Sequence, residues 1–249
     1  MKKSIISFIH THMKKVFPAI LCTTAILALA TSLVYHSGVN VLALFTNGSP
    51  NSLTKIGDIV QFGGTDWLVL DIQGKKALAL SNEILSEKPY HSDNVAITWE
   101  ECHLRQYLNT EFYDSAFSAS EKERIVETTL ANLDNPWYNT AGGSDTVDKV
   151  FLLSIEEVLQ YFGDSGGLEN RQDNVTFIKD GLNEKRVAKT PEGGSAWWWL
   201  RSAGIFFYLC EHVNSCAAEV NHHGDLSVQG NFVTNGDGGV RPALWISLY

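Results

Sequence analysis

The stretch Gly239-Val240-Arg241-Pro242-Ala243-Leu244-Trp245-Ile246 decides the fold of this chain. The part from Val240 to Ile246 is typical of a buried strand, except that it contains an arginine and a proline. A buried guanidinium must be paired with a carboxylate or stacked on an aromatic ring, because an uncompensated buried charge is strongly destabilising. We therefore expect Arg241 to fasten the interior of a domain rather than to bind a ligand.

A second apolar run, from Trp197 to Ser202, also carries one arginine near its end, Arg201. Successive residues of a strand point to opposite faces, so the three consecutive tryptophans of this run cannot all point inward. At least one of them should be exposed or lie under a loop, where an indole offers a platform for a sugar or a peptide. We expect Arg201, Arg241, Trp199 and Trp245 to be structural.

These two runs, together with Thr98–Asn109 and Asp148–Ser154, resemble a family of bacterial surface domains of unknown function. The resemblance covers roughly residues 56 to 249. That family is similar to the C-type-lectin-like fold, which formylglycine-generating enzymes share. The resemblance implies an α+β domain with antiparallel strands, about three helices and long irregular loops. The last strand of that fold carries a Gly-aromatic-Arg motif, and Val240 stands in the aromatic place here.

The first 45 residues form an apolar leader, which we expect to be a signal peptide or a membrane anchor. Lys14 and Lys15 precede Val16–Val34, about 19 residues without a charge, which is long enough to span a bilayer. The small residues Ala28-Leu29-Ala30 favour cleavage, whereas the apolar patch Val39–Phe45 favours retention, and both outcomes stay open. In either case the lysines should stay in the cytoplasm and the bulk of the chain should be exported.

A flexible spacer, residues 46–55, should separate the leader from one globular domain, residues 56–249. Met13 is an alternative start to Met1.

Four of the 19 basic residues lie in the leader, which holds no acid, so the rest carries 15 basic and 28 acidic residues, a net charge of −13. This balance disfavours nucleic acid and anionic membrane surfaces as partners. A membrane contact is expected only through an uncleaved leader.

Local patterns predict both strands and helices. A Ser or Thr followed three residues later by Glu predicts helix starts at Thr98, Ser118 and Ser154. Apolar, β-branched or alternating runs predict strands over Ile59–Phe62, Asp66–Ile72, Lys76–Ser81, Trp197–Leu200, Ala217–Asn221, Asp225–Gln229 and Val240–Ile246. Two long stretches, Leu133–Asp145 and Gly163–Ala196, lack periodicity, and such stretches inside a compact domain are usually functional or mobile.

The loops before the last strands are the expected ligand face. Their polar residues are Asn221, His222, His223, Asp225, Asn235 and Asp237. Adjacent histidines in a hairpin should point to opposite faces, so the His222 and His223 side chains are poorly placed to share one metal ion. Asparagine and aspartate oxygens between Asn231 and Gly239 are suitable ligands for calcium, but the spacing of a known calcium loop is missing. No metal and no other cofactor is expected.

Cys210 and Cys216 are separated by five residues in a domain that should face an oxidising compartment, so we expect a local disulfide. Formylglycine-generating enzymes keep two reactive cysteines in a comparable region, and the resemblance therefore implies a redox or copper site as the alternative. Cys102 is expected to be a buried apolar residue.

The sequence lacks a phosphate loop, a nucleophile elbow and a metalloprotease histidine pair. We therefore predict a secreted or membrane-anchored module that binds a surface carbohydrate or protein and has no catalytic residue. Two alternatives stay open. One is an enzyme that uses Cys210 and Cys216, and the other is an accessory domain that only scaffolds a surface complex.

Overall fold

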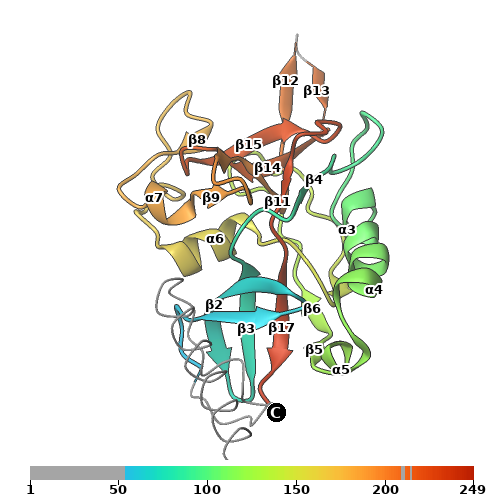
Figure 1. Ribbon diagram of the computed structural model, residues 1–249. Helices are drawn as coiled ribbons and strands as arrows, with labels where there is room; N and C mark the ends of the chain where they lie inside the picture. The colour runs from blue at the N-terminus through green and yellow to red at the C-terminus, as the bar shows by residue number, and fades with distance from the viewer. Residues whose placement is uncertain (1–53, 209–210, 214) are drawn as a thin grey trace, which may run out of the picture. The chain divides into compact units, whose positions relative to one another are not determined.

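The computed structural model describes residues 54–208, 211–213 and 215–249, which belong to one compact unit (Figure 1). The predicted leader and most of the predicted spacer lie outside the described residues. Among the residues that are described, no helix is long and apolar enough to cross a membrane. The elements confirm an α+β domain with mostly antiparallel sheets.

The first sheet is antiparallel, and its strands follow the order β1-β2-β3-β17-β5. Its members are β1 (Ile59–Phe62), β2 (Thr65–Gln73), β3 (Lys76–Ser81), β17 (Ala243–Ser247) and β5 (Ile125–Val126). The three strands that open the domain confirm the prediction from their apolar runs. The late strand β17 lies between β3 and β5, so the carboxyl end of the domain completes a sheet that its amino end begins.

The second sheet has the order β4-β16-β11-β14-β15-β8. Its members are β4 (Ser86–Glu87), β16 (Gly239–Val240), β11 (Trp198–Ala203), β14 (Cys216–Val220), β15 (Leu226–Phe232) and β8 (Phe177–Ile178). All of its pairs are antiparallel except β11 with β16. Three short two-stranded ladders join β6 (Thr128–Leu130) to β7 (Thr146–Asp148), β9 (Ala188–Lys189) to β10 (Ser195–Ala196), and β12 (Phe206–Tyr208) to β13 (Glu211–Val213).

The predicted single strand Val240–Ile246 is wrong, because the chain changes sheets in its middle. Strand β16 ends at Val240 in the second sheet and β17 begins at Ala243 in the first, with Arg241 and Pro242 between them. Proline has no N–H to donate to a ladder, so the junction between two sheets suits it. The Pro242 carbonyl still accepts a hydrogen bond of 2.8 Å from the backbone N–H of Ser81.

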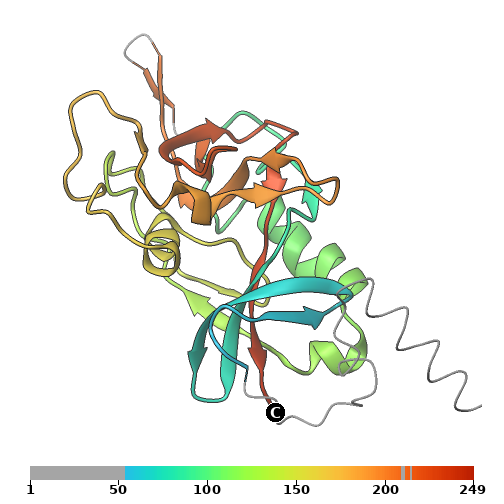
Figure 2. The ribbon, with the colours of Figure 1, turned by 60° about the vertical axis from the view of Figure 1, so that its left-hand side comes forward.

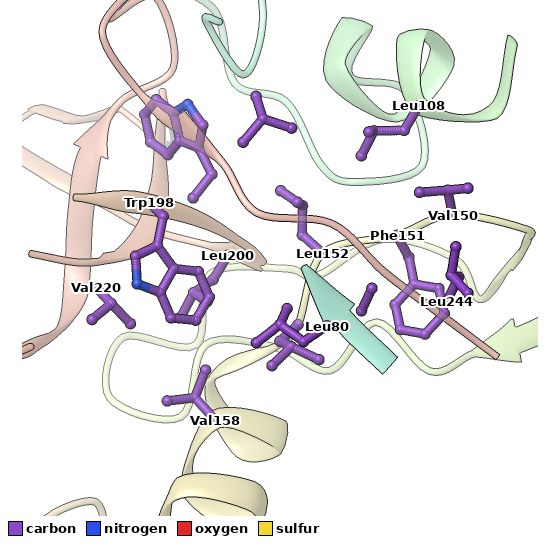
Figure 3. Close-up of a cluster of buried hydrophobic side chains, with 14 of the residues drawn as sticks. Leu80, Leu108, Val150, Phe151, Leu152, Val158, Trp198, Leu200, Val220 and Leu244 are labelled. Carbon is purple, nitrogen blue, oxygen red and sulfur yellow. The ribbon is translucent and has the colours of Figure 1, made fainter. Parts of the chain in front are cut away.

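One hydrophobic core connects the two sheets. Figure 3 shows Trp198 and Leu200 of the second sheet in the same cluster as Leu80 and Leu244 of the first. Each of these four side chains has no exposed surface. Burying a large apolar side chain contributes about 1.5–3 kcal/mol, so this shared cluster holds the sheets together as one folding unit.

The helices are short and lie outside the sheets. They are α3 (His103–Tyr107), the π-helix η1 (Leu108–Phe112), α4 (Tyr113–Ala116), α5 (Ala119–Lys122), α6 (Ile155–Phe162) and α7 (Asn183–Arg186). The predicted starts at Ser118 and Ser154 are confirmed, and each residue forms a complete capping box. Helix α6 turns four apolar side chains into the core, namely Ile155, Val158, Leu159 and Phe162. Figure 2 shows α6 end-on, beside both sheets.

The predicted helix start at Thr98 is wrong. Helix α3 begins at His103, and Cys102 is its N-cap, with Sγ accepting a hydrogen bond of 3.4 Å from the backbone N–H of Arg105. Residues 98–101 form a turn instead, because the buried Trp99 indole donates to the Asp148 carboxylate at 2.9 Å and holds the chain there. Cys102 is buried, as expected.

Candidate functional site

The predicted ligand face separates into two places in the structure. Residues 221–225 form a tight turn between β14 and β15, in which the Asn221 side-chain oxygen accepts the backbone N–H groups of His223 and Asp225 at 2.8 and 3.0 Å. Asp225 is buried, and its carboxylate accepts the side-chain amides of Asn183 and Asn221. Asp225 therefore stabilises the turn, and its burial keeps the carboxylate away from solvent.

The rings of His222 and His223 lie together rather than on opposite faces, with their centroids 3.9 Å apart. The alternation of side chains applies to extended strands, and the two histidines sit in a turn, where it does not hold. Both side chains are exposed.

Asn235 and Asp237 lie in the loop between β15 and β16. The Asn235 amide donates to the Asn231 side-chain oxygen at 2.5 Å, and the Asn231 amide donates to Glu219 at 3.3 Å. Burial raises the pKa of Glu219 to about 7, the Asn231 hydrogen bond opposes this shift, and the charge of Asp237 adds to it. Across the described residues no three His, Cys, Asp or Glu side chains gather to hold a metal. Calcium in this loop stays an open alternative to the expectation of no metal.

The cysteine prediction also stays open, because Cys210 lies outside the described residues. Cys216 is buried at the start of β14. Burial, and to a lesser degree the charge of Glu219, raises the pKa of the Cys216 thiol to about 12.

The four residues expected to be structural lie inside the domain. Arg201 makes a two-pronged ion pair with Glu157, and its Nη1 also donates to the Leu152 carbonyl at 2.9 Å. Arg241 stacks on an indole, with its guanidinium carbon 4.9 Å from the centre of the Trp198 ring, and burial lowers its pKa to about 10.

Of the two tryptophans expected to be structural, Trp199 has no exposed surface, and its Nε1 donates to the Lys88 carbonyl at 2.9 Å. A Cβ on Gly238 would lie 1.9 Å from that indole nitrogen, so only glycine fits there. Trp245 is nearly buried, with the Lys76 ammonium 4.3 Å from its ring centre.

An open groove of about 280 Å³ lies between the two irregular stretches that the sequence singled out. Its walls combine two aromatic rings with aliphatic, amide and cationic side chains. They are formed by Trp137, Ser165, Gly167, Asn170, Arg171, Gln172, Val175, Phe177, Ile178 and Lys179. The volume is close to the lower end of ligand sites, about 300–1,000 Å³, and the mixture of apolar and polar groups is typical of them.

Asn135 holds the loop that carries Trp137. This side chain has no exposed surface, and its amide donates to the carbonyls of Ala203 and Val228 at 2.7 and 2.8 Å. Its oxygen accepts the backbone N–H groups of Trp137 and Tyr138 at 3.0 and 3.2 Å. All four hydrogen bonds of the amide are therefore made, which ties this irregular loop rigidly to the second sheet.

Arg171 forms one wall of the groove by stacking on two aromatic rings. Its guanidinium carbon lies 4.8 Å from the centre of the Trp137 ring and 4.5 Å from that of Tyr138. Its three hydrogen bonds go to the carbonyls of Val175 and Trp137 and to the Tyr138 hydroxyl, at 3.1 to 3.3 Å. These contacts hold the planar guanidinium in one orientation.

A buried ion pair supports the opposite wall. Asp180 accepts from Arg186 at 3.0 Å and from the Ser165 hydroxyl at 2.7 Å, and the Arg186 side chain has no exposed surface. Burial alone would raise the pKa of Asp180, but the hydrogen bonds from Arg186 and Ser165 outweigh burial and lower it. Asp180 directly follows the groove residue Lys179, so the pair fixes that end of the wall.

A larger cleft, about 390 Å³, lies beside α3 and η1, and its walls include Lys88, His103 and Tyr107. The Lys88 ammonium lies 4.2 Å from the centre of the Tyr107 ring and covers the only six-membered aromatic ring of that cleft. The groove at Trp137 keeps Phe177 open to solvent, with 42% of its surface exposed. For this reason we take the smaller groove as the candidate site.

Trp137, Arg171 and Phe177 were not among the residues predicted from the sequence. The irregular stretches that contain them were predicted to be functional or mobile, and their lack of periodicity was the available signal. The contacts between them depend on the fold, since Trp137 and Arg171 lie far apart in the chain and meet at the groove, which β8 of the second sheet also lines.

The fold and the groove together define a single α+β domain with a preformed ligand-sized depression in its irregular segments. Residues 74–248 match a domain of unknown function, DUF6273, and the chain belongs to that family. The whole groove lies within the matched region. No curated protein and no solved structure matches the chain.

Proposed function

We propose that this protein is a saccharide-binding module that acts outside the cytoplasmic membrane, either secreted or anchored by its leader. The observation that carries the proposal is the groove at Trp137, where an exposed Phe177 ring and a fixed indole stand beside amide side chains. Aromatic faces pack against the C–H faces of sugar rings, and amides bond their hydroxyl groups. Export is supported by the apolar leader. A C-type-lectin-like relation is supported by the Gly239–Arg241 motif alone.

The size of the groove favours a small ligand over a protein partner. A compact ligand that fills the groove of about 280 Å³ has a surface of roughly 200 Å², well below the about 800 Å² that each partner buries in a specific protein interface. Its walls are held by Asn135 and by the Asp180–Arg186 pair, so little ordering entropy is lost when a ligand binds. The groove is therefore suited to one or two sugar units at the end of a glycan.

The competing enzyme proposal gains little support from Cys216. A reactive cysteine has a lowered thiol pKa, and burial of Cys216 acts in the opposite direction. The scaffold proposal requires a protein partner and predicts no small ligand.

A glycan array with the purified chain, followed by calorimetry on the hits, tests saccharide binding. Phe177→Ala should weaken binding about fivefold, because it removes an exposed aromatic contact worth about 1 kcal/mol. Leu133→Ala is the matched control, since Leu133 is 58% exposed on an irregular stretch but lies outside the groove. An array without hits, or equal affinities for the two variants, would refute the proposal.

A further inference from the structure

The groove at Trp137 has a charge opposite to that of the chain around it. The chain carries 28 acidic and 19 basic residues, yet the side chains that line the groove include Arg171 and Lys179 and no Asp or Glu. The nearby acids Asp164, Glu169 and Asp173 are exposed on the same segment but do not line the groove. A local cationic surface therefore faces the ligand.

Neither groove cation forms an ion pair with the residues that the structure describes. Within the described part of the chain the ion pairs join Arg105, Lys122, Lys149, Arg186 and Arg201 to carboxylates, and none involves Arg171 or Lys179. The acid closest in sequence to Lys179 is Asp180, and Arg186 and Ser165 already hold its carboxylate.

The guanidinium of Arg171 retains donor capacity. Arginine has five N–H donors, and three hydrogen bonds to neutral groups are made here. Stacking on Trp137 and Tyr138 fixes the plane of the guanidinium and leaves its edges available for hydrogen bonds. A planar fork with a fixed orientation matches the two oxygens of a carboxylate.

We propose that the groove selects a saccharide that bears a carboxylate, such as a uronic or sialic acid unit, with the sugar ring against Phe177 and the carboxylate between Arg171 and Lys179. This inference rests on the proposed function and narrows its ligand class. The aromatic wall provides contact area for the sugar ring, and the two cations make the groove selective for acidic over neutral sugars.

Pairs of glycans that differ only in charge test the proposal on the purified chain. The probes, measured by calorimetry, are trigalacturonic acid with its methyl ester and sialyllactose with the methyl ester of its sialic acid unit. For at least one pair, the acidic member should bind at least about tenfold more tightly. Raising the salt concentration from about 50 to 300 mM should weaken binding of the acidic member only, because exposed charges are screened.

Lys179→Gln should reduce affinity for the acidic member about three- to tenfold and leave affinity for the neutral member unchanged. Lys185→Gln is the matched control, because Lys185 is exposed and lies outside the groove. Arg171→Lys keeps the charge but removes the fork, and it should also weaken binding of the acidic member.

The outcomes separate the two proposals. Equal binding of acidic and neutral members would overturn the inference and leave saccharide binding standing. Failure of every acidic probe, with neutral glycans bound on the array, would also overturn it. Binding of acidic peptides without any glycan would overturn both proposals.

Discussion

Glu219 is the side chain whose ionisation should be most visible in the stability of this protein. It lies in β14, half-buried, and burial raises its pKa to about 7 from an ordinary value of 4.5. Between these two pH values the folded state keeps a proton that the unfolded state has lost. Stability therefore falls as the pH rises through this window.

The size of the effect follows from the shift in pKa. A shift of about 2.5 units corresponds to about 3 kcal/mol, at about 1.4 kcal/mol for each unit. Glu219→Gln keeps the shape of the side chain and removes its charge, so the variant should be up to about 3 kcal/mol more stable than the parent at pH 8. The two should be equally stable near pH 4.5, where Glu219 is protonated in the folded state.

Urea unfolding at pH 4.5, 6 and 8 measures this difference, and thermal unfolding should show a gain of roughly 6–12 °C at pH 8. Glu184→Gln is the matched control, because Glu184 is exposed on α7. Asp237→Asn should give a smaller gain of the same sign, since Asp237 adds to the raised pKa of Glu219. A stability difference for Glu219→Gln that does not change with pH would refute the reasoning.

Three further substitutions test the interior. Glu157→Gln should cost about 3 kcal/mol in urea unfolding, because it leaves the buried Arg201 without a countercharge, and a loss below about 1 kcal/mol would contradict this. Gly230→Ala should destabilise the protein far more than Gly64→Ala. Both glycines have a positive φ, 83° and 69°, but only at Gly230 would the new Cβ meet a carbonyl oxygen, at 2.0 Å. Equal losses of stability in the two variants would contradict this reasoning. Asn135→Ala should cost about 2–4 kcal/mol and also weaken saccharide binding, and unchanged binding would show that the groove does not depend on this amide.

The features predicted correctly from the sequence depend on neighbouring residues. The capping boxes at Ser118 and Ser154 and the opening strands require only short patterns. The same pattern failed at Thr98, where the distant Asp148 holds Trp99 and bends the chain. A local pattern is reliable only where no long-range contact competes with it.

The groove could not be predicted from local sequence patterns for the same reason. Trp137 is placed by a buried asparagine that bonds two strands far along the chain, and its ring meets Arg171 from a separate irregular stretch. The exchange of sheets at Arg241 was equally hidden, because Val240 and Ala243 are both apolar but pair with residues of different sheets.

The segment from β16 to β17 also constrains how the domain is made. It supplies an interior strand to each sheet, yet it is the last of their elements to leave the ribosome. Until it emerges, β3 and β11 each lack a neighbouring strand, so the nascent chain cannot complete either sheet. Synthesis should therefore produce an open precursor that becomes compact in one late step, and cutting the chain before Gly239 should release an aggregation-prone polypeptide rather than a smaller stable domain.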